Sequence, residues 1–181
     1  MSDRVLHDNI DRVFSILDVD GDGVISRDDF TSMGAGVAGE FGFAVDSPRA
    51  RGLIAKYEEI WDQLRGADLD LDGAVGPEEF REAHTSGQVT TEGLVEKWVS
   101  ATRGNFEVAD RDGDGYLDLD TFAAIYRGAG IPDRRVAEAA FRAMDVDADG
   151  RLDWNELSAQ ARGLFTTSDG SAKGAHMVSG D

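Results

Sequence analysis

The sequence predicts an all-α fold made of four helix–loop–helix units in two pairs. One acidic pattern, Asp-x-Asp-x-Asp-Gly, recurs four times along the 181 residues, beginning at Asp18, Asp68, Asp110 and Asp145. Apolar residues on both sides of each copy return at intervals of about 3.6, the period of one helix face. We therefore expect each acidic segment to be a loop between two amphipathic helices, in a compact two-lobed arrangement.

The first loop is expected at residues 18–29, between two helices. Apolar positions lead into it and out of it at Val5, Ile10, Val13, Phe14, Leu17, Phe30, Met33 and Val37. Glycines follow closely at positions 34, 36, 39 and 42. Since glycine is a poor helix former, we expect them to loosen the exiting helix and to place a bend before Ser47.

The second loop is expected at residues 68–79. Its entering helix should begin with Ser47 as the N-cap and Pro48 in the first turn, because both residues favour a helix start. The apolar face of that helix is Leu53, Ile54, Tyr57, Ile60, Trp61 and Leu64, and Phe80 follows the loop. The polar segment 85–90 interrupts the helical pattern, so no long uninterrupted central helix is predicted.

The third and fourth loops are expected at residues 110–121 and 145–156. Their flanking apolar positions are Leu94, Val95, Trp98, Val99, Phe106, Phe122, Ile125, Tyr126, Val136, Ala140, Phe141, Met144, Trp154, Leu157 and Leu164. The predicted organisation is one loop pair in residues 1–86 and another in residues 87–165. A polar, glycine-rich tail at 166–181 is expected to be flexible.

The loop spacing matches the needs of Ca²⁺, which takes six to eight oxygen ligands at about 2.3–2.6 Å. The first, third and fifth positions supply carboxylates, and the sixth is a glycine that permits a sharp turn. The predicted carboxylate ligands are Asp18, Asp20, Asp22, Asp68, Asp70, Asp72, Asp110, Asp112, Asp114, Asp145, Asp147 and Asp149. The seventh position contributes a backbone carbonyl, from Val24, Ala74, Tyr116 and Arg151. The eighth is apolar in every loop, which predicts short strand pairing between loops.

The twelfth position distinguishes the loops, because it closes the ion cage with a bidentate carboxylate. Glu79 and Glu156 meet this requirement. Asp29 is one methylene shorter, which favours the smaller Mg²⁺ in loop one. Thr121 has no carboxylate, so loop three is expected to be weak for Ca²⁺, and either empty or occupied by Mg²⁺. Three calcium sites are therefore expected.

Charge excludes several classes of partner. The chain has 36 acidic and 18 basic residues, a formal net charge of −18 that repels nucleic acid and anionic membranes. The loop positions hold 17 of the acids, so the other 19 nearly balance the bases. There is no cysteine, nucleophile motif or phosphate-binding glycine loop, so no enzyme activity is expected. A cytoplasmic location is the expectation from a charged start without an apolar signal segment. A monomer is also expected.

The four loops, the long first pair and the short connector at 85–90 make the chain similar to the EF-hand superfamily, in particular to sarcoplasmic calcium-binding and bacterial calerythrin-like proteins. This resemblance spans roughly Arg4 to Phe165 and implies a compact intracellular calcium buffer or transporter. Two alternatives stay open. A calcium sensor would regulate a dedicated protein partner, although Met33 and Met144 are too few for a methionine-rich groove. A luciferin-type carrier would hold an apolar ligand among aromatic side chains.

Overall fold

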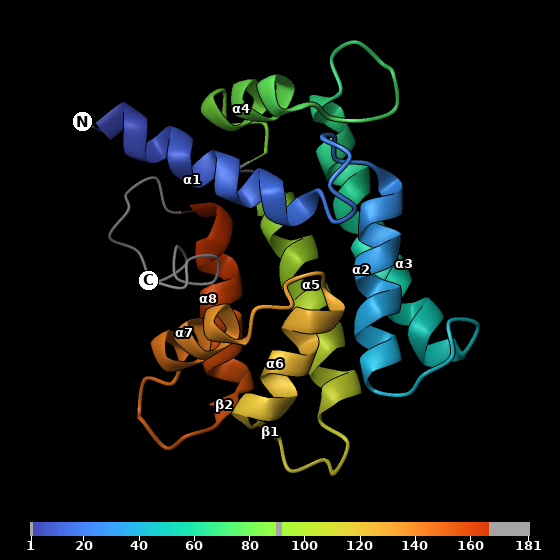
Figure 1. The fold of residues 1–181 in the computed structure, drawn as a ribbon, viewed down its shortest axis with the longest axis vertical. Helices are drawn as coiled ribbons and strands as arrows, with labels where there is room; N and C mark the ends of the chain where they lie inside the picture. Colours follow the sequence, from blue (N-terminus) through green and yellow to red (C-terminus); the bar gives the residue numbers. More distant parts are fainter. Residues whose placement is uncertain (1, 90–91, 167–181) are drawn as a thin grey trace.

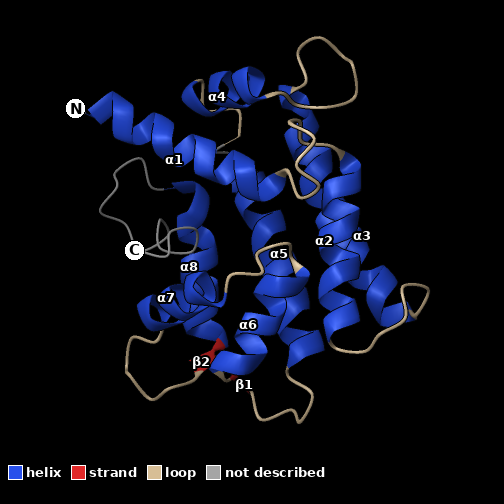
Figure 2. Cartoon of the chain, in the orientation of Figure 1, coloured by secondary structure: helices blue, strands red, loops and turns tan. Residues whose placement is uncertain are grey.

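Helices dominate the structure, a computed structural model that describes residues 2–89 and 92–166 (Figures 1 and 2). The helices are α1 (Ser2–Leu17), α2 (Arg27–Glu40), α3 (Pro48–Leu64), the short 3-10 helix η1 (Arg65–Ala67), α4 (Pro77–Thr85), α5 (Glu92–Ala109), α6 (Leu119–Gly128), α7 (Arg134–Met144) and α8 (Trp154–Thr166). The strands are β1 (Tyr116–Leu117) and β2 (Leu152–Asp153). The all-α prediction is confirmed. The expected tail lies outside the described residues from 167 onward.

The first two loops connect α1 with α2 and α3 with α4, and local sequence sets the helix starts. The Ser47 hydroxyl accepts a hydrogen bond from the Ala50 backbone N–H at 3.2 Å, and Pro48 opens α3, as predicted. Ile25 and Val75, the eighth loop positions, exchange backbone hydrogen bonds of 2.9 and 2.8 Å. These bonds join the two loops back to back.

The second pair is joined in the same way, through a two-stranded antiparallel sheet. Tyr116 of β1 lies opposite Asp153 of β2, and Leu117 lies opposite Leu152. Both leucines are buried, at 1% and 0% exposure. The predicted strand pairing at the eighth position is confirmed in both pairs.

The glycines of α2 do not loosen that helix, and this expectation was wrong. The helix continues through Gly34, Gly36 and Gly39 to Glu40, and the chain turns only near Gly42, which has φ of +78°. A Cβ on Gly34 would lie 2.8 Å from the Ile54 Cα of α3. The missing side chains therefore let neighbouring helices approach closely, and tertiary packing outweighs the low helix propensity of glycine.

One continuous apolar core runs through both pairs. Helix α2 packs against α3 and against α6 of the second pair, while α3 packs against α5 (Figure 1). The buried Tyr57 hydroxyl accepts a 2.9 Å hydrogen bond from Asn105 Nδ2, which links α3 to α5. None of the described helices is long and apolar enough to cross a membrane.

The contact between α2 and α6 is unusually close. A Cβ on Gly36 would lie 2.1 Å from the Gly128 carbonyl oxygen, so the two backbones touch at this point. Beside it, Arg127 of α6 pairs with Glu40 of α2, with Nε donating to Oε1 at 2.9 Å. The pKa of Glu40 is lowered, chiefly by this hydrogen bond from Arg127. The two halves of the chain thus meet through backbone as well as side chains.

Candidate metal sites in four acidic loops

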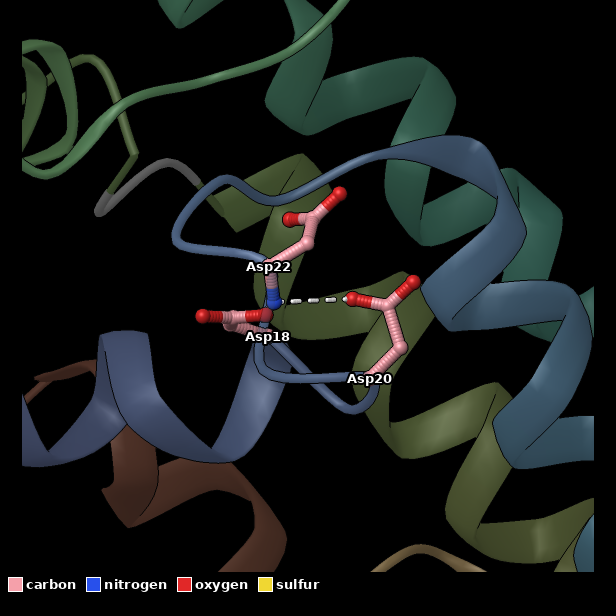
Figure 3. Close-up of side chains that lie close together, drawn as sticks. All are labelled: Asp18, Asp20 and Asp22. Atoms are coloured by element: carbon pink, nitrogen blue, oxygen red, sulfur yellow. Dashed lines mark hydrogen bonds between the residues drawn. The ribbon is translucent and has the colours of Figure 1, made fainter.

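Each of the four loops gathers three carboxylates whose oxygens lie within 4.8 Å of one another. The four groups are Asp18, Asp20 and Asp22; Asp68, Asp70 and Asp72; Asp110, Asp112 and Asp114; and Asp145, Asp147 and Glu156. Figure 3 shows the first group, where the Asp22 backbone N–H donates to Asp20 Oδ1 at 3.1 Å. The structure thus brings together most of the predicted side-chain ligands. Asp29, Glu79 and Asp149 do not belong to these groups.

Glycine and positive φ angles shape the turns. Gly23, Gly73, Gly115 and Gly150, the sixth positions, have φ between +80° and +95°, which a side chain rarely adopts. Their backbone N–H groups donate to the aspartate at the first position, for example Gly23 to Asp18 Oδ2 at 3.1 Å. The sharp turn predicted at the sixth-position glycine is confirmed, and its N–H binds the aspartate at the first position.

Loops one and two contain an oxygen that fits a bound cation. Asp18 Oδ1 and Asp68 Oδ1 are buried and have no hydrogen-bond donor among the described residues. A buried carboxylate oxygen without a partner is costly, and a hard divalent cation is the ligand that would satisfy it. The equivalent carboxylates of loops three and four differ. Both oxygens of Asp110 accept from backbone N–H groups, and so do both oxygens of Asp145.

The carboxylate at the twelfth position accepts hydrogen bonds from the backbone of its own loop. Glu79 Oε1 accepts from the Leu69 N–H at 2.8 Å, and its Oε2 accepts from the Gly76 N–H at 2.8 Å. These backbone bonds, the Gly76 bond first, lower the pKa of Glu79, so the side chain is ionised as a ligand must be. Glu156 makes the equivalent contacts with Val146 and Asp153.

Asp29 makes the same contacts in loop one despite its shorter side chain. Its Oδ1 accepts from the Val19 N–H at 2.9 Å, and its Oδ2 accepts from the Ser26 N–H at 2.7 Å. The side chain is only 3% exposed, so these bonds are well shielded. Asp29 thus holds the loop backbone as Glu79 does, and the preference of loop one for Mg²⁺ stays a prediction.

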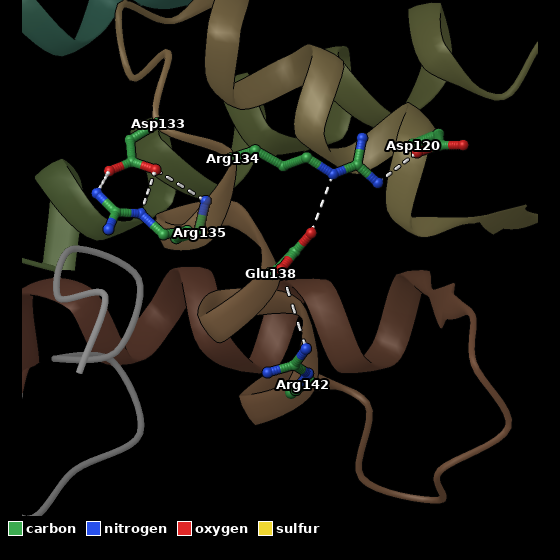
Figure 4. A network of polar contacts seen from close by, with 6 residues as sticks. All are labelled: Asp120, Asp133, Arg134, Arg135, Glu138 and Arg142. Atoms are coloured by element: carbon green, nitrogen blue, oxygen red, sulfur yellow. Dashed lines mark hydrogen bonds and ion pairs between the residues drawn. The ribbon is translucent and has the colours of Figure 1, made fainter.

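Loop three lacks this closing carboxylate. Thr121 stands at the position, and its backbone N–H donates to Asp118 Oδ1 at 2.8 Å, which caps α6 and lowers the pKa of Asp118. The neighbouring Asp120 accepts a 2.6 Å bond from Arg134 of α7 (Figure 4). Arg134 also pairs with Glu138, which extends the network along α7 (Figure 4).

Sequence reasoning missed the position of the Arg151 side chain. It was expected to contribute only a backbone carbonyl in loop four. Its guanidinium instead lies 3.8 Å from Asp114 Oδ2 of loop three. The pairing of β1 with β2 brings these two residues together, and no local sequence pattern predicts their contact.

The loops match known calcium-binding proteins. Family models match as an EF-hand domain pair over residues 99–162 and as an EF hand over residues 10–33. A probable calcium-binding protein of Oryza sativa subsp. japonica is 30% identical over 84% of this chain and 90% of its own length. Calerythrin of Saccharopolyspora erythraea is 26% identical over 90% of this chain and 93% of its own length.

Solved structures agree with these sequence matches. The structure of a Streptomyces coelicolor calcium-binding protein, described as the structural basis for prokaryotic calcium-mediated regulation by that protein, superposes with a TM-score of 0.79. It is 30% identical over 89% of this chain and 98% of its own. The coelenterazine-binding protein of Renilla muelleri, at 22% identity and TM-score 0.66 over 97% and 95% of the two chains, shares the fold alone.

Proposed function

Since this chain belongs to the EF-hand family of calcium-binding proteins and is calerythrin-like, we propose that it is an intracellular calcium buffer that holds its ions in loops one, two and four. Calcium binding itself is a property of the family. The buffer role is the more specific part of the proposal, and the packing between the two halves supports it.

The observation that carries the buffer role is the backbone contact between α2 and α6. A sensor exposes an apolar groove when its helix pairs open, and such grooves are typically rich in methionine. Here the exiting helix of loop one is packed against α6 of the other half through Gly36 and Gly128. Met33 and Met144 are 2% and 1% exposed and belong to the core. Opening a pair would require breaking this contact.

The charge of the loops supports a strong effect of ions on stability. Three carboxylates within 4.8 Å of one another repel each other in each described loop. A cation that binds only the folded chain stabilises it by mass action. Ion binding should therefore tighten the fold of a buffer without creating a new surface.

A calcium sensor is the second candidate, and the Streptomyces coelicolor neighbour favours it because that protein is described in terms of regulation. A carrier of a luciferin-type ligand has less support. The interior space lined by Tyr57, Trp98 and Tyr126 measures about 80 Å³. Sites for drug-sized ligands have about 300–1,000 Å³, so this space would need to expand several-fold.

Calorimetric titration of the metal-free chain with Ca²⁺, with and without Mg²⁺, tests the proposal when a hydrophobic dye is followed in parallel. A buffer should bind three ions tightly while dye binding falls. Rising dye binding on calcium addition would support the sensor instead. Tight binding of fewer than three ions would contradict the proposed sites.

A further inference from the structure

Arg151 extends from loop four toward loop three. Its guanidinium carbon lies 5.6 Å from the centre of the Tyr116 ring, and its Nη1 lies 3.8 Å from Asp114 Oδ2. A guanidinium over an aromatic face is held by the ring's negative potential. The pairing of β1 with β2 thus gives this cation a fixed support next to the carboxylates of the other loop.

Arg151 lines the same cleft as the carboxylates of loop three. A cleft of about 570 Å³ is lined by Asp110, Asp112 and Asp114 of loop three together with Arg151. Arg111 also lines this cleft, so two arginines contribute to its lining. The first pair offers no counterpart at the seventh position, where Val24 and Ala74 stand.

Both carboxylate oxygens of Asp110, the first aspartate of loop three, accept hydrogen bonds within the loop. Asp110 Oδ1 accepts from the Gly113 N–H at 2.8 Å, and its Oδ2 accepts from the Gly115 N–H at 3.2 Å. In contrast, Asp18 and Asp68 each keep a buried oxygen without a donor among the described residues. The first aspartate of loop three is thus satisfied internally, as Asp145 of loop four also is, so this feature separates the second pair of loops from the first. What loop three has in addition is the positive charge of Arg151 beside Asp114.

We propose that Arg151 is a tethered counter-cation for loop three, which opposes divalent cations there and makes this loop the last to fill. The proposal rests on the proposed calcium-binding function and specifies how one loop is regulated. Arg151 acts on loop three through the charge and position of its side chain. A substitution there leaves its backbone carbonyl, the expected ligand of loop four, in the chain. Arg151 couples the loops, because a charged side chain of loop four lies beside a carboxylate of loop three.

The size of the effect follows from Coulomb's law. A unit charge and a divalent ion roughly 6 Å apart in water repel each other enough to weaken binding by about tenfold. Salt screens this repulsion, with a Debye length of about 30 Å at 0.01 M and about 3 Å at 1 M. An effect of Arg151 through charge should therefore be largest in low salt.

The test is calorimetric Ca²⁺ titration of the full chain carrying Arg151→Gln, in low and in high salt. The weakest site should bind about tenfold more tightly in low salt, and the gain should vanish near 1 M salt. Arg142→Gln is the control, because it removes one positive charge from the same half, where Arg142 pairs with Glu138 on α7 (Figure 4). It should change the weakest site by less than about twofold.

A second genetic background and a second measurement keep the test decisive if Thr121 alone prevents ion binding in loop three. Arg151→Gln is repeated in a Thr121→Glu background, where loop three regains its closing carboxylate. Terbium luminescence sensitised by Tyr116 follows loop three separately, and Tyr116→Phe supplies the blank while keeping a ring beneath Arg151.

An unchanged weakest site in both backgrounds would overturn the proposal, as would an equal gain from Arg142→Gln. Either result would leave the calcium function intact as long as loops one, two and four still bind. A chain that binds no Ca²⁺ in any of these variants would instead contradict the proposed function itself.

Discussion

The contact between Gly36 and Gly128 allows a specific prediction, because both partners are backbone and neither can change rotamer to make room. In Gly36→Ala the new Cβ would lie 2.1 Å from the Gly128 carbonyl oxygen, whereas ordinary contact begins at 3.4 Å. Helices α2 and α6 must therefore separate by more than about 1 Å at this point. The separation would also loosen Val37 and Ala38, which are both 0% exposed.

The magnitude has two opposing parts. Overpacking of a core costs about 1–3 kcal/mol, and contact between two backbones belongs at the upper end. Alanine in place of a helical glycine contributes about 1 kcal/mol of stability in return. The free energy of unfolding of Gly36→Ala should thus fall by about 2 kcal/mol.

Gly39→Ala is a matched control in the same helix. A Cβ there would meet nothing within 4 Å, so only the helix propensity changes. This variant should gain up to about 1 kcal/mol. The two variants should therefore differ by about 3 kcal/mol although each adds one methyl group to α2.

Urea unfolding at a fixed free Ca²⁺ concentration measures the difference, since bound ions would otherwise shift stability. With a slope of about 2 kcal/mol per molar urea, Gly36→Ala should lower the midpoint by about 1 M. It should also raise dye binding, because the apolar interface between the halves opens. If the two variants shift the midpoint equally and in the same direction, the close approach of α2 and α6 is refuted.

Four further predictions concern single sites. Thr121→Glu should add one bound Ca²⁺ in calorimetry, and an unchanged stoichiometry would show that the missing carboxylate is not what weakens loop three. Asp29→Glu should strengthen Ca²⁺ relative to Mg²⁺ in competition titrations, and equal ratios would count against the length argument. Leu71, with φ of +62° and 84% exposure, should be replaced by Asn with a gain of about 0.5–1 kcal/mol in urea unfolding, and a loss would contradict strain there. Burial raises the pKa of Tyr57 to about 12. The buried, protonated Tyr57 therefore stabilises the fold fully below about pH 10, and this contribution is lost as pH rises toward about 12. Tyrosinate absorbance should grow together with loss of helical circular dichroism. Ionisation of every tyrosine near pH 10 with intact helices would refute this.

The sequence predicts those parts of the structure that depend on local spacing. The acidic pattern correctly brings carboxylates of each loop together, and the N-cap at Ser47 and the apolar eighth positions Ile25 and Leu117 are confirmed. Each follows from residues close together in the chain, because caps and loop turns are local structures. The same reasoning singles out Thr121 in loop three, and the weak Ca²⁺ binding expected there stays a prediction.

The features that the sequence did not predict depend on contacts between distant residues. Gly36 looked like a helix breaker until its partner Gly128, 92 residues away, gave it a packing role. Arg151 looked like a residue with a free side chain until the strand pairing set it beside Asp114. In both cases a propensity argument treated the residue alone, whereas the structure is decided by what approaches it.

The two unpredicted features act on different parts of calcium binding. The contact at Gly36 joins the halves, so ions bound in loop one are expected to stabilise the second half as well as the first. Arg151 lowers the affinity of a single loop and leaves the core untouched. A chain with both features can fill its tighter sites and become more rigid while loop three stays open to a further rise in calcium. If Arg151→Gln erased this difference without changing the urea midpoint of the metal-free chain, affinity and packing would be shown to be set by separate residues.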